Sequence, residues 1–368
     1  MSQDSRGRGR RAAAKRSRRK PTTKRRKALT LTAWTAAGVV LLGGAGFGYF
    51  YVKYNSNLKS VDIDAALGKD RPQNVDNGSM DILVLGSDSR GGDNAQYGAD
   101  DGGSARSDTA MVVHLYEGHK QASIVSIPRD TMINRPACTT SGGKTAKAAF
   151  EQFNEAYTVG GATCAVKTVE KISGIRMDHY IEVDFTGFKK IVDSLGGVPL
   201  TTTKPIKDDK GSHLDLPAGT HKLNGEQSLG LVRTRKSVGV GSDLGRIQLQ
   251  QAFIKALIKQ VKSIGVFDNP KRLLSVADTA TKAITTDKGL GDVKSLMGFA
   301  AGLQGLGAES MHMVTLPVMD YPKDKDRVVP LEAESKMVWD ALRGDQPIPA
   351  EATQNSANDR SGAGSIVQ

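Results

Sequence analysis

The sequence has few of the residues from which common redox and zinc sites are built. Only two of its 368 residues are cysteines, Cys138 and Cys164, and they do not form a C-x-x-C pair. The six histidines include no H-E-x-x-H motif. These absences leave no support for a thioredoxin-like or zinc-binding protein and argue against a zinc hydrolase.

Two further catalytic signatures are missing. No G-x-x-x-x-G-K-[ST] sequence occurs, and the "GVG" at residues 239–241 does not form one. Ser87 and Ser89 do not lie in a G-x-S-x-G motif, and no partner for a serine nucleophile is evident. The sequence therefore indicates neither a P-loop nucleotidase nor a serine hydrolase.

Positive charge is abundant but confined to one end. The chain has a net charge of +12, and residues 1–27 contain 13 Lys and Arg residues and a single acid, Asp4. Removing these from the totals of 51 and 39 leaves 38 basic and 38 acidic residues in the rest of the chain. The body is electrically balanced, which makes a nucleic-acid-binding role for it improbable.

Residues 28–52, "ALTLTAWTAAGVVLLGGAGFGYFYV", carry no charge. At about 1.5 Å per residue a helix of this length exceeds the roughly 30 Å hydrocarbon core of a bilayer. The basic tail before it and Tyr49, Phe50 and Tyr51 at its end fit a cytoplasmic N-terminus and an aromatic anchor. The alternatives are a cleaved signal peptide, for which no small-x-small site precedes Lys53, and a buried core helix. We expect a single-pass cell-membrane anchor.

A cytoplasmic N-terminus leads to two further expectations, one for the basic tail and one for the two cysteines. The cytoplasmic tail has a sufficient partner in the anionic inner leaflet, which attracts each Lys or Arg near the surface by about 1 kcal/mol. Residues 53–368 would lie outside the cell, where Cys138 and Cys164 can form a structural disulfide. The alternative is two unrelated buried thiols.

The remaining sequence predicts one layered α/β domain. Residues 53–78 are expected to be a polar linker, residues 79–345 the folded domain, and residues 346–368 a disordered tail with few large apolar residues. Apolar runs predict strands at residues 82–85, 110–116, 122–127, 179–184 and 310–318, and helices are predicted at 162–173, 185–195 and 243–264. Strands that alternate with helices favour a largely parallel or mixed central sheet.

Charged side chains recur where these strands meet loops. In open α/β sheets ligands bind at the carboxyl ends of strands, so such loops can converge on one crevice. Arginine dominates the set, and its planar fork matches phosphate oxygens. Several arginines around two carboxylates suit a diphosphate held with a divalent cation, although each Arg–Asp pair taken alone is more often a structural salt bridge. The set comprises Asp88, Arg90, Arg106, Asp108, Arg129, Asp130, Arg233, Arg235 and Arg246.

Seven stretches between residues 80 and 259 resemble, in order, motifs of the LytR–CpsA–Psr family of Gram-positive envelope proteins, of the actinobacterial type. They are "DILVLGSDSR", "RSDTAMVVHL", "SIVSIPRDTMI", "FNEAYTVGGA", "DHYIEVDFTGFKKIVDSLGGVPL", "LNGEQSLGLVRTRK" and "GRIQLQQAFIKAL". The resemblance implies an α/β/α sandwich with a central mixed sheet and an apolar tunnel for a polyprenyl chain. It also implies a phosphotransferase that moves a glycopolymer with one phosphate from a polyprenyl-pyrophosphate carrier to the 6-hydroxyl of N-acetylmuramic acid in peptidoglycan, releasing polyprenyl phosphate.

By the same resemblance, Asp88 and Asp108 are the carboxylates for Mg²⁺ or another divalent cation such as Mn²⁺, and Asp88 is also the candidate general base. The cysteine pair is similar to a disulfide of some Gram-positive members. Gln152 stands where a basic residue often precedes the "FNEAY" motif, which leaves a cationic role there in doubt. The expected diphosphate clamp is Arg106, Arg129, Arg233 and Arg235, with Arg90, Arg246 and Gln250 as additional substrate contacts.

Two alternative functions remain open from the sequence. The same site could let water attack the diphosphate, which would make the protein a lipid pyrophosphatase. The protein could also be a non-catalytic envelope regulator or glycan-binding module. The glycopolymer and the oligomeric state are not indicated by any motif.

Overall fold

The computed structural model describes residues 48–88, 107–209, 211–235, 243–354 and 366–367. The chain divides into two compact units, residues 1–52 and residues 53–368. Residues 48–57 are helical. Among the described residues no helix combines the length and apolar character needed to cross a bilayer. Residues 28–47 of the expected anchor and the basic tail lie outside the described residues, so both stay predictions.

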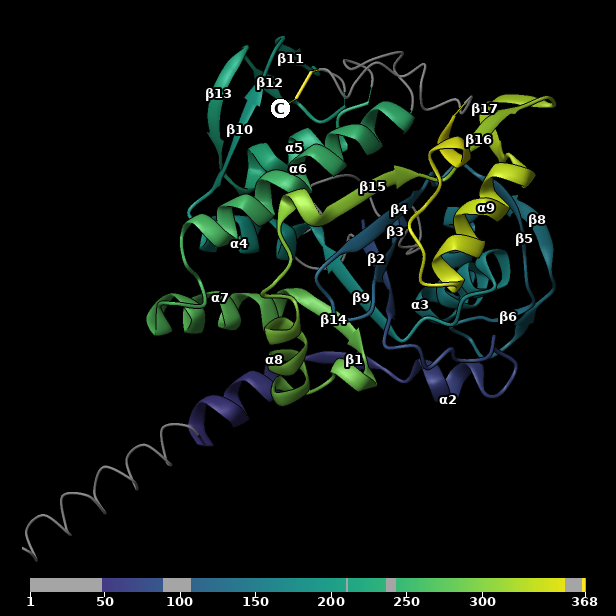
Figure 1. The fold of residues 1–368 in the computed structure, drawn as a ribbon, viewed down its shortest axis with the longest axis horizontal. Helices are drawn as coiled ribbons and strands as arrows, with labels where there is room; N and C mark the ends of the chain where they lie inside the picture. Colours follow the sequence, from purple (N-terminus) through teal and green to yellow (C-terminus); the bar gives the residue numbers. More distant parts are fainter. Residues whose placement is uncertain (1–47, 89–106, 210, 236–242, 355–365, 368) are drawn as a thin grey trace, which may run out of the picture. The chain divides into compact units, whose positions relative to one another are not determined.

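Seven strands of the described residues form the central sheet of the second unit (Figure 1). Neighbouring strands are parallel in the pairs β1–β14, β9–β2 and β4–β15 and antiparallel in the others, which confirms the predicted mixed sheet. In spatial order the strands are β1 (Lys59–Val61), β14 (Ile284–Asp287), β9 (His179–Asp184), β2 (Met80–Ser87), β3 (Ser107–Leu115), β4 (Ala122–Ile127) and β15 (Met311–Thr315).

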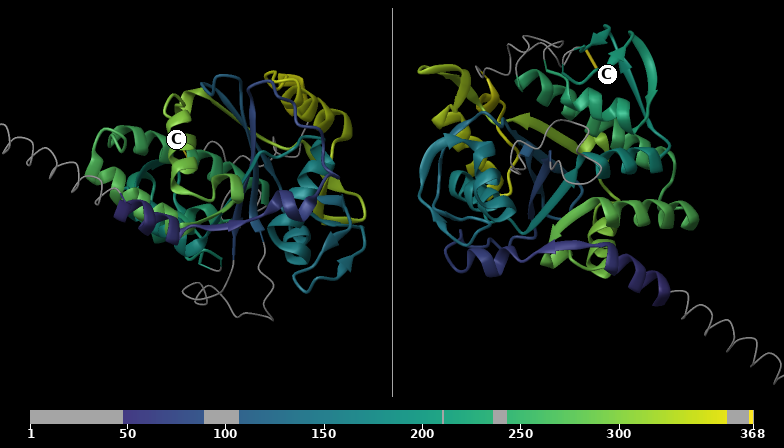
Figure 2. Two further views of the ribbon diagram at one scale, coloured as in Figure 1. Left: turned by 90° about the horizontal axis from the view of Figure 1, so that it is seen from below. Right: turned by 180° about the vertical axis from the view of Figure 1, so that it is seen from behind.

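Strand β2 shows how the sheet acquires a helix layer on each face. Successive side chains of a strand point to opposite faces. Leu83 and Leu85 pack with residues of α3 (Phe153–Ser173) and α9 (Glu332–Arg343), whereas Ile82 and Val84 pack with residues of α8 (Val293–Gly302). Seen from below, the helices lie on both sides of the sheet (Figure 2, left). The expected α/β/α layering is present.

A second hydrophobic core lies beside the sheet and positions the site. It joins α4 (Phe185–Ser194), α5 (Gly225–Arg233) and α6 (Asp243–Ser263) to two small hairpins, through fully buried side chains such as Leu223 and Leu249. These hairpins pair β10 (Val198–Thr202) with β13 (Gly219–Leu223) and β11 (Ile206–Lys207) with β12 (Asp215–Leu216).

The remaining elements surround these two cores. Hairpins pair β5 (Met132–Arg135) with β8 (Ala149–Gln152), β6 (Cys138–Thr139) with β7 (Thr145–Ala146), and β16 (Val318–Tyr321) with β17 (Asp324–Pro330). The other helices are α2 (Ile63–Leu67), α7 (Pro270–Ala283) and the 3₁₀ turns Lys288–Leu290, Ala308–Ser310 and Ala350–Thr353.

Helix α3 begins nine residues earlier than predicted. The predicted range, 162–173, covers only the part of α3 that follows a break in the helix. Gly160 and Gly161 depart from helical geometry, and Gly161 has φ of +60°, a conformation that suits glycine. A Cβ on Gly160 would lie 2.7 Å from the Thr139 carbonyl oxygen, so the glycine lets β6 approach. There Cys138 of β6 and Cys164 of α3 form the predicted disulfide, with a Cα–Cα distance of 5.5 Å.

The other predicted elements agree with the structure, with one exception. Strands β4 and β9 and helices α4 and α6 match their predicted ranges to within a residue. The single strand predicted over residues 310–318 is instead divided between β15 and the start of β16. Pro317 lies between them, and proline cannot donate a hydrogen bond to a neighbouring strand.

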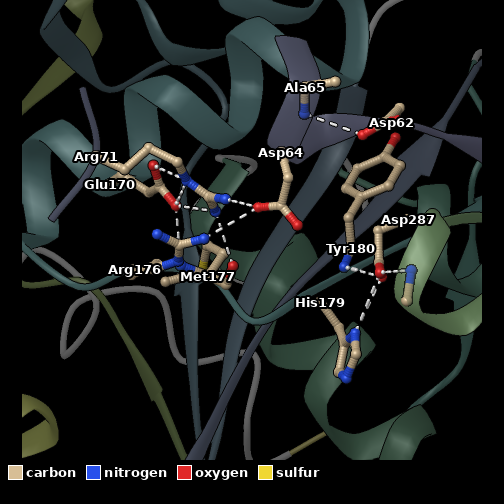
Figure 3. Close-up of polar contacts among 11 residues, drawn as sticks. Asp62, Asp64, Ala65, Arg71, Glu170, Arg176, Met177, His179, Tyr180 and Asp287 are labelled. Atoms are coloured by element: carbon tan, nitrogen blue, oxygen red, sulfur yellow. Dashed lines mark hydrogen bonds and ion pairs between the residues drawn. The ribbon is translucent and has the colours of Figure 1, made fainter. Parts of the chain in front are cut away.

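The structure corrects the expectation of a polar linker over residues 53–78. Strand β1 pairs with β14 at the sheet edge. Farther along, the Arg71 side chain is 2% exposed and pairs with Glu170, which is 3% exposed, and with Asp64 (Figure 3). Arg71 also donates to the Met177 carbonyl oxygen at 2.9 Å. The segment is also held by Ile63, which is buried in the main core, so a few isolated apolar residues and distant ion pairs fix it where no periodic apolar run predicts an element.

The predicted disordered tail also differs in part. Ile348 and Ala352 are buried in the main core with α3 and α9. Val367 is buried in the second core and forms a β-bridge with Thr202. Residues 355–365 and 368 lie outside the described residues. Short segments with one or two apolar contacts are therefore ordered here despite their polar composition.

Candidate functional site

The site begins at a register shift between β2 and β3. Gly86 pairs with Thr109, but the next residue, Ser87, pairs with Ser107, so Asp108 is an extra residue in β3. Such bulges re-aim a side chain and often lie beside active sites. Asp88 follows β2 at the same end of the sheet and is 8% exposed. Both predicted carboxylates, Asp88 and Asp108, therefore lie at the same end of the central strands β2 and β3.

Asp108 is surrounded by arginines from three separate segments. Its carboxylate forms an ion pair with Arg129, which follows β4, and lies 3.7 Å from Nη2 of Arg235, which follows α5. Arg246, in the first turn of α6, donates to the Asp108 carbonyl oxygen at 2.8 Å. Burial would raise the pKa of Asp108, but Arg246, Arg129 and Arg235 outweigh it and lower the pKa.

A second acid, Asp243, lies among the same arginines. One of its oxygens is 2.5 Å from Nη2 of Arg246, 3.7 Å from Nε of Arg129 and 3.9 Å from Nε of Arg235. Both carboxylate oxygens are buried without a hydrogen bond of acceptable geometry. Sequence reasoning treated Asp243 only as a helix start. Its position three residues before Arg246 was the available signal, because residues three apart share a helix face.

Asp108, Arg235 and Arg246 line a cavity of about 230 Å³, and Arg129 and Asp243 lie behind them. Arg233 lies over the ring of Phe185, with its guanidinium carbon 4.8 Å from the ring centroid. Gln250 donates to the Thr109 hydroxyl at 2.9 Å and to the Val232 carbonyl oxygen at 3.1 Å. The lining residues are Asp108, Thr109, Phe185, Asp208, Gly211, Val232, Arg233, Arg235, Arg246 and Gln250.

The electrostatics of Arg235 indicate what the cavity would accept. Burial and the positive charges of Arg246 and Arg129 together lower the pKa of Arg235 to about 10, because they outweigh Asp243 and Asp108, which raise it. The surroundings therefore disfavour an additional positive charge even though two acids are close. A polyanion in the cavity would relieve this repulsion.

The structure thus brings together six of the nine predicted site residues in or directly beside one cavity. They are Asp108, Arg129, Arg233, Arg235, Arg246 and Gln250. Arg90 and Arg106 lie outside the described residues. Asp88 lies at the same edge of the sheet, where its charge acts on the Tyr157 hydroxyl.

Tyr157, of the "FNEAY" motif, was not predicted as a site residue. Its hydroxyl donates to Glu182 of β9 at 2.6 Å, and Glu182 also accepts from Tyr180. Burial and the adjacent Glu182 carboxylate raise the pKa of Tyr157 well above its ordinary value. Tyr157 therefore remains a neutral donor beside Asp88.

Gln152 stands where a basic residue was expected, and a basic side chain, Arg327, lies beside it. In the amide orientation that satisfies its neighbours, Gln152 donates to Asp130 at 3.1 Å and accepts from Nε of Arg327 at 2.9 Å. Arg327 belongs to β17 and lies 3.7 Å from Asp130, which neighbours Arg129. A positive side chain thus reaches this place from a distant hairpin, and no local motif could have indicated it.

The described residues do not form a metal cage by themselves. In the ranges that the structure covers, no three His, Cys, Asp or Glu side chains are arranged to hold a metal ion. Mg²⁺ usually takes one or two protein carboxylates and completes its shell with substrate phosphates and water. Asp88 and Asp108 are the two carboxylates that such a metal would use at this end of the sheet.

Comparison with known proteins gives the same assignment along most of the chain. Residues 50–344 match the LytR_cpsA_psr family. Over 317 residues the chain is 31% identical to the polyisoprenyl-teichoic acid–peptidoglycan teichoic acid transferase TagT of Bacillus subtilis, covering 83% of this chain and 89% of that protein. Over 353 residues it is 29% identical to the cell wall biosynthesis protein LcpA of Corynebacterium glutamicum, covering 88% and 67%.

Solved structures agree in fold. One described as "TagT bound to LI-WTA" gives a TM-score of 0.55 at 27% identity, covering 76% of this chain and 97% of that one. The LytR-Csp2A-Psr enzyme from Actinomyces oris gives a TM-score of 0.55 at 23% identity, covering 78% and 95%. The motifs, the mixed sheet and the extent of these matches lead to one conclusion: the chain belongs to the LytR_cpsA_psr family.

Proposed function

We propose that this protein is a membrane-anchored phosphotransferase that attaches a glycopolymer to peptidoglycan. The donor would be a polyprenyl-pyrophosphate-linked glycopolymer, and the acceptor the 6-hydroxyl of N-acetylmuramic acid. Relatives named as teichoic acid transferases to peptidoglycan support the general reaction. The observation that carries the proposal is the convergence of Arg129, Arg235 and Arg246 on Asp108 in a cavity that favours a polyanion.

In the proposed reaction the acceptor oxygen attacks the phosphorus nearer the glycopolymer. A new oxygen–phosphorus bond forms, the bridging bond of the diphosphate breaks, and polyprenyl phosphate leaves with the bridging oxygen. Negative charge grows on that oxygen, and fixed guanidinium groups stabilise such charge without reorganising. Arg129, Arg233 and Arg235 fill this role. Asp88 is the proposed acceptor of the hydroxyl proton.

A divalent cation, Mg²⁺ or Mn²⁺, would be held by Asp88 and Asp108 together with diphosphate oxygens. When bound it would neutralise part of the diphosphate charge. The chain's own residues supply the other functions. Arg246 fixes the backbone at Asp108, and Gln250 ties Thr109 of β3 to the end of α5. The clamp and the carboxylates are thereby held in one arrangement.

The test is to incubate the full-length protein in lipid nanodiscs with lipid-linked glycopolymer and peptidoglycan oligomers. We expect a covalent product containing one phosphate between glycan and peptidoglycan, together with polyprenyl phosphate. Release of free phosphorylated glycan without a linked product would instead identify a pyrophosphatase. Binding of the glycan with no turnover would support a glycan-binding module or regulator.

A further inference from the structure

The residues that directly follow the predicted membrane span are fixed to α7. Tyr54 is 5% exposed, and its hydroxyl donates to the Leu274 carbonyl oxygen at 3.2 Å. Lys53 forms an ion pair with Asp278 one turn further along α7, at 2.8 Å. The segment is therefore bound to the domain at once, without a spacer.

The same segment is also fixed to α8. The Asn55 side-chain oxygen accepts from the backbone N–H of Val293, the first residue of α8, at 2.8 Å. Asn57 donates to the Thr281 hydroxyl of α7 at 3.3 Å. Because these contacts come from one short segment, α7 and α8 both lie beside it (Figure 1).

Chain length then limits how far α7 can lie from the bilayer. Only Lys53 separates the predicted end of the span, Val52, from Tyr54, and a step of two residues extends at most about 7 Å. The headgroup layer on each side of the hydrocarbon core is roughly 5–8 Å thick. Tyr54, which contacts α7 at Leu274, would therefore lie at the level of the headgroups, with α7 and α8 beside it.

Both helices expose large apolar side chains at this place. Leu274 on α7 is 37% exposed, and Met297, one turn after Val293 on α8, is 58% exposed. Phe267, just before α7, is 42% exposed. In the described part of the second unit only three other large apolar side chains are so exposed, and none of them lies on these helices.

The charges of these helices have one dominant sign. Within their bounds α7 and α8 contain four basic residues and one acid, Asp278, which already pairs with Lys53 and Lys282, and Asp268 and Asp292 lie just before the two helices. Lys271 and Lys294 are exposed. Apolar side chains beside lysines are the pattern of helices that lie in the membrane interface and bind anionic lipid.

We propose that α7 and α8 form a membrane-contact surface, defined by Phe267, Lys271, Leu274, Lys294 and Met297, that lies on the outer headgroup layer of an anionic phospholipid bilayer. The surface would hold the catalytic domain in one orientation against the membrane from which its proposed lipid substrate comes. The proposal depends on the predicted span but not on the transfer activity.

Depth-dependent quenching tests this proposal in the full-length protein reconstituted into nanodiscs. A fluorophore is attached at Met297→Cys, and nitroxide-labelled phospholipid serves as the quencher. Met319→Cys, on the β16–β17 hairpin, is the matched control because Met319 is 42% exposed and lies away from α7 and α8 (Figure 1). The native cysteines are joined in a disulfide, so the introduced thiol is labelled selectively.

We expect a loss of roughly half of the fluorescence at position 297 and little loss at 319, the result for a side chain at the headgroup boundary. Replacing phosphatidylglycerol by phosphatidylcholine, or introducing Lys271→Glu with Lys294→Glu, should reduce the quenching at 297. Equal quenching at both positions would overturn the proposal, and so would quenching at 297 that ignores lipid charge. Product formation, measured on the same samples, reports separately on the transferase proposal.

Discussion

Arg71 and Arg235 each lie beside two acids, but the balance of charge around them differs. Arg71 is enclosed by Glu170 and Asp64 and donates to the Met177 carbonyl oxygen (Figure 3). Burial would lower its pKa, but the two carboxylates outweigh burial and raise it. The arginine is fully paired, and the contact is structural.

Arg235 behaves in the opposite way, whereas Asp108, Asp130 and Asp243 raise the pKa of its neighbour Arg129 despite burial. Arg235 has two acids within 4 Å, yet burial, Arg246 and Arg129 lower its pKa to about 10. Near it the Nε atoms of Arg129 and Arg246 are buried without a hydrogen bond. The comparison shows that burial and nearby acids do not reveal whether an arginine is structural. The balance of charge around it does, because a deficit of negative charge indicates that an anion is to be bound.

The largest expected effect comes from removing Glu170, the partner of the buried Arg71. Glu170→Ala leaves Arg71 buried without its main partner, which should cost about 3–5 kcal/mol of unfolding free energy. Chemical denaturation of the reconstituted protein measures this loss. The control is Glu309→Ala, which removes a pair whose side chains are 67% and 90% exposed and should cost about 0–1 kcal/mol. A loss no larger than that of the control would contradict the structural role.

The second effect concerns activity and not stability. Arg235→Ala should reduce turnover at least about 100-fold, the scale of removing one transition-state charge contact, while stability stays unchanged or rises because a repelled charge is removed. Arg176→Ala is the matched control, because both side chains are 33% exposed and Arg176 pairs only on the structural side with Asp64. Near-normal turnover of the Arg235 variant would favour a non-catalytic role for the family site here.

A smaller effect should appear when an anion binds in the cavity lined by Arg233, Arg235 and Arg246. Inorganic diphosphate at ten times its dissociation constant should stabilise the protein by about 1.4 kcal/mol, measured by thermal unfolding. The increment should shrink in Arg235→Ala but persist in Arg176→Ala. Removing divalent cations with EDTA should also shrink it if Asp88 and Asp108 share a metal with the diphosphate. An EDTA-insensitive increment would argue against the metal.

The smallest effect tests a third buried cation. His114 is fully buried between Asp81, at 2.8 Å, and Asp345, at 3.0 Å. Burial would lower its pKa, but the hydrogen bonds to Asp81 and Asp345 raise it above 6.5. Its contribution to stability is then complete below about pH 6.5 and is lost as the pH rises through the folded-state pKa. Unfolding midpoints from about pH 6 to about pH 9 should fall less steeply in His114→Gln. A slope equal to wild type would exclude His114 as its source.

The sequence predicted the strands and the loops that carry the site, because apolar runs and the charged residues at their ends are local features. The pairing of Asp243 with Arg246 could have been inferred from their spacing, but its approach to Arg129 and Arg235 could not, since that requires α6 to begin beside β3. Arg327 reaches the site from β17 for a similar reason. Residues 53–78 were misjudged because isolated buried residues such as Ile63 and ion pairs such as Arg71–Glu170, which are 99 residues apart, leave no periodic pattern.

One extra residue in β3 has a consequence for how this chemistry can vary. The bulge sets the face on which Asp108 lies. If β3 continued past Thr109 in regular register, alternation would point the Asp108 carboxylate into the opposite layer of the domain. Insertions or deletions elsewhere can be absorbed by loops, but a change in residue count at this bulge would exchange the site-facing and the core-facing side chains of β3. Sequence changes around the cavity should therefore be tolerated in the surrounding loops and not in the residue count of this strand.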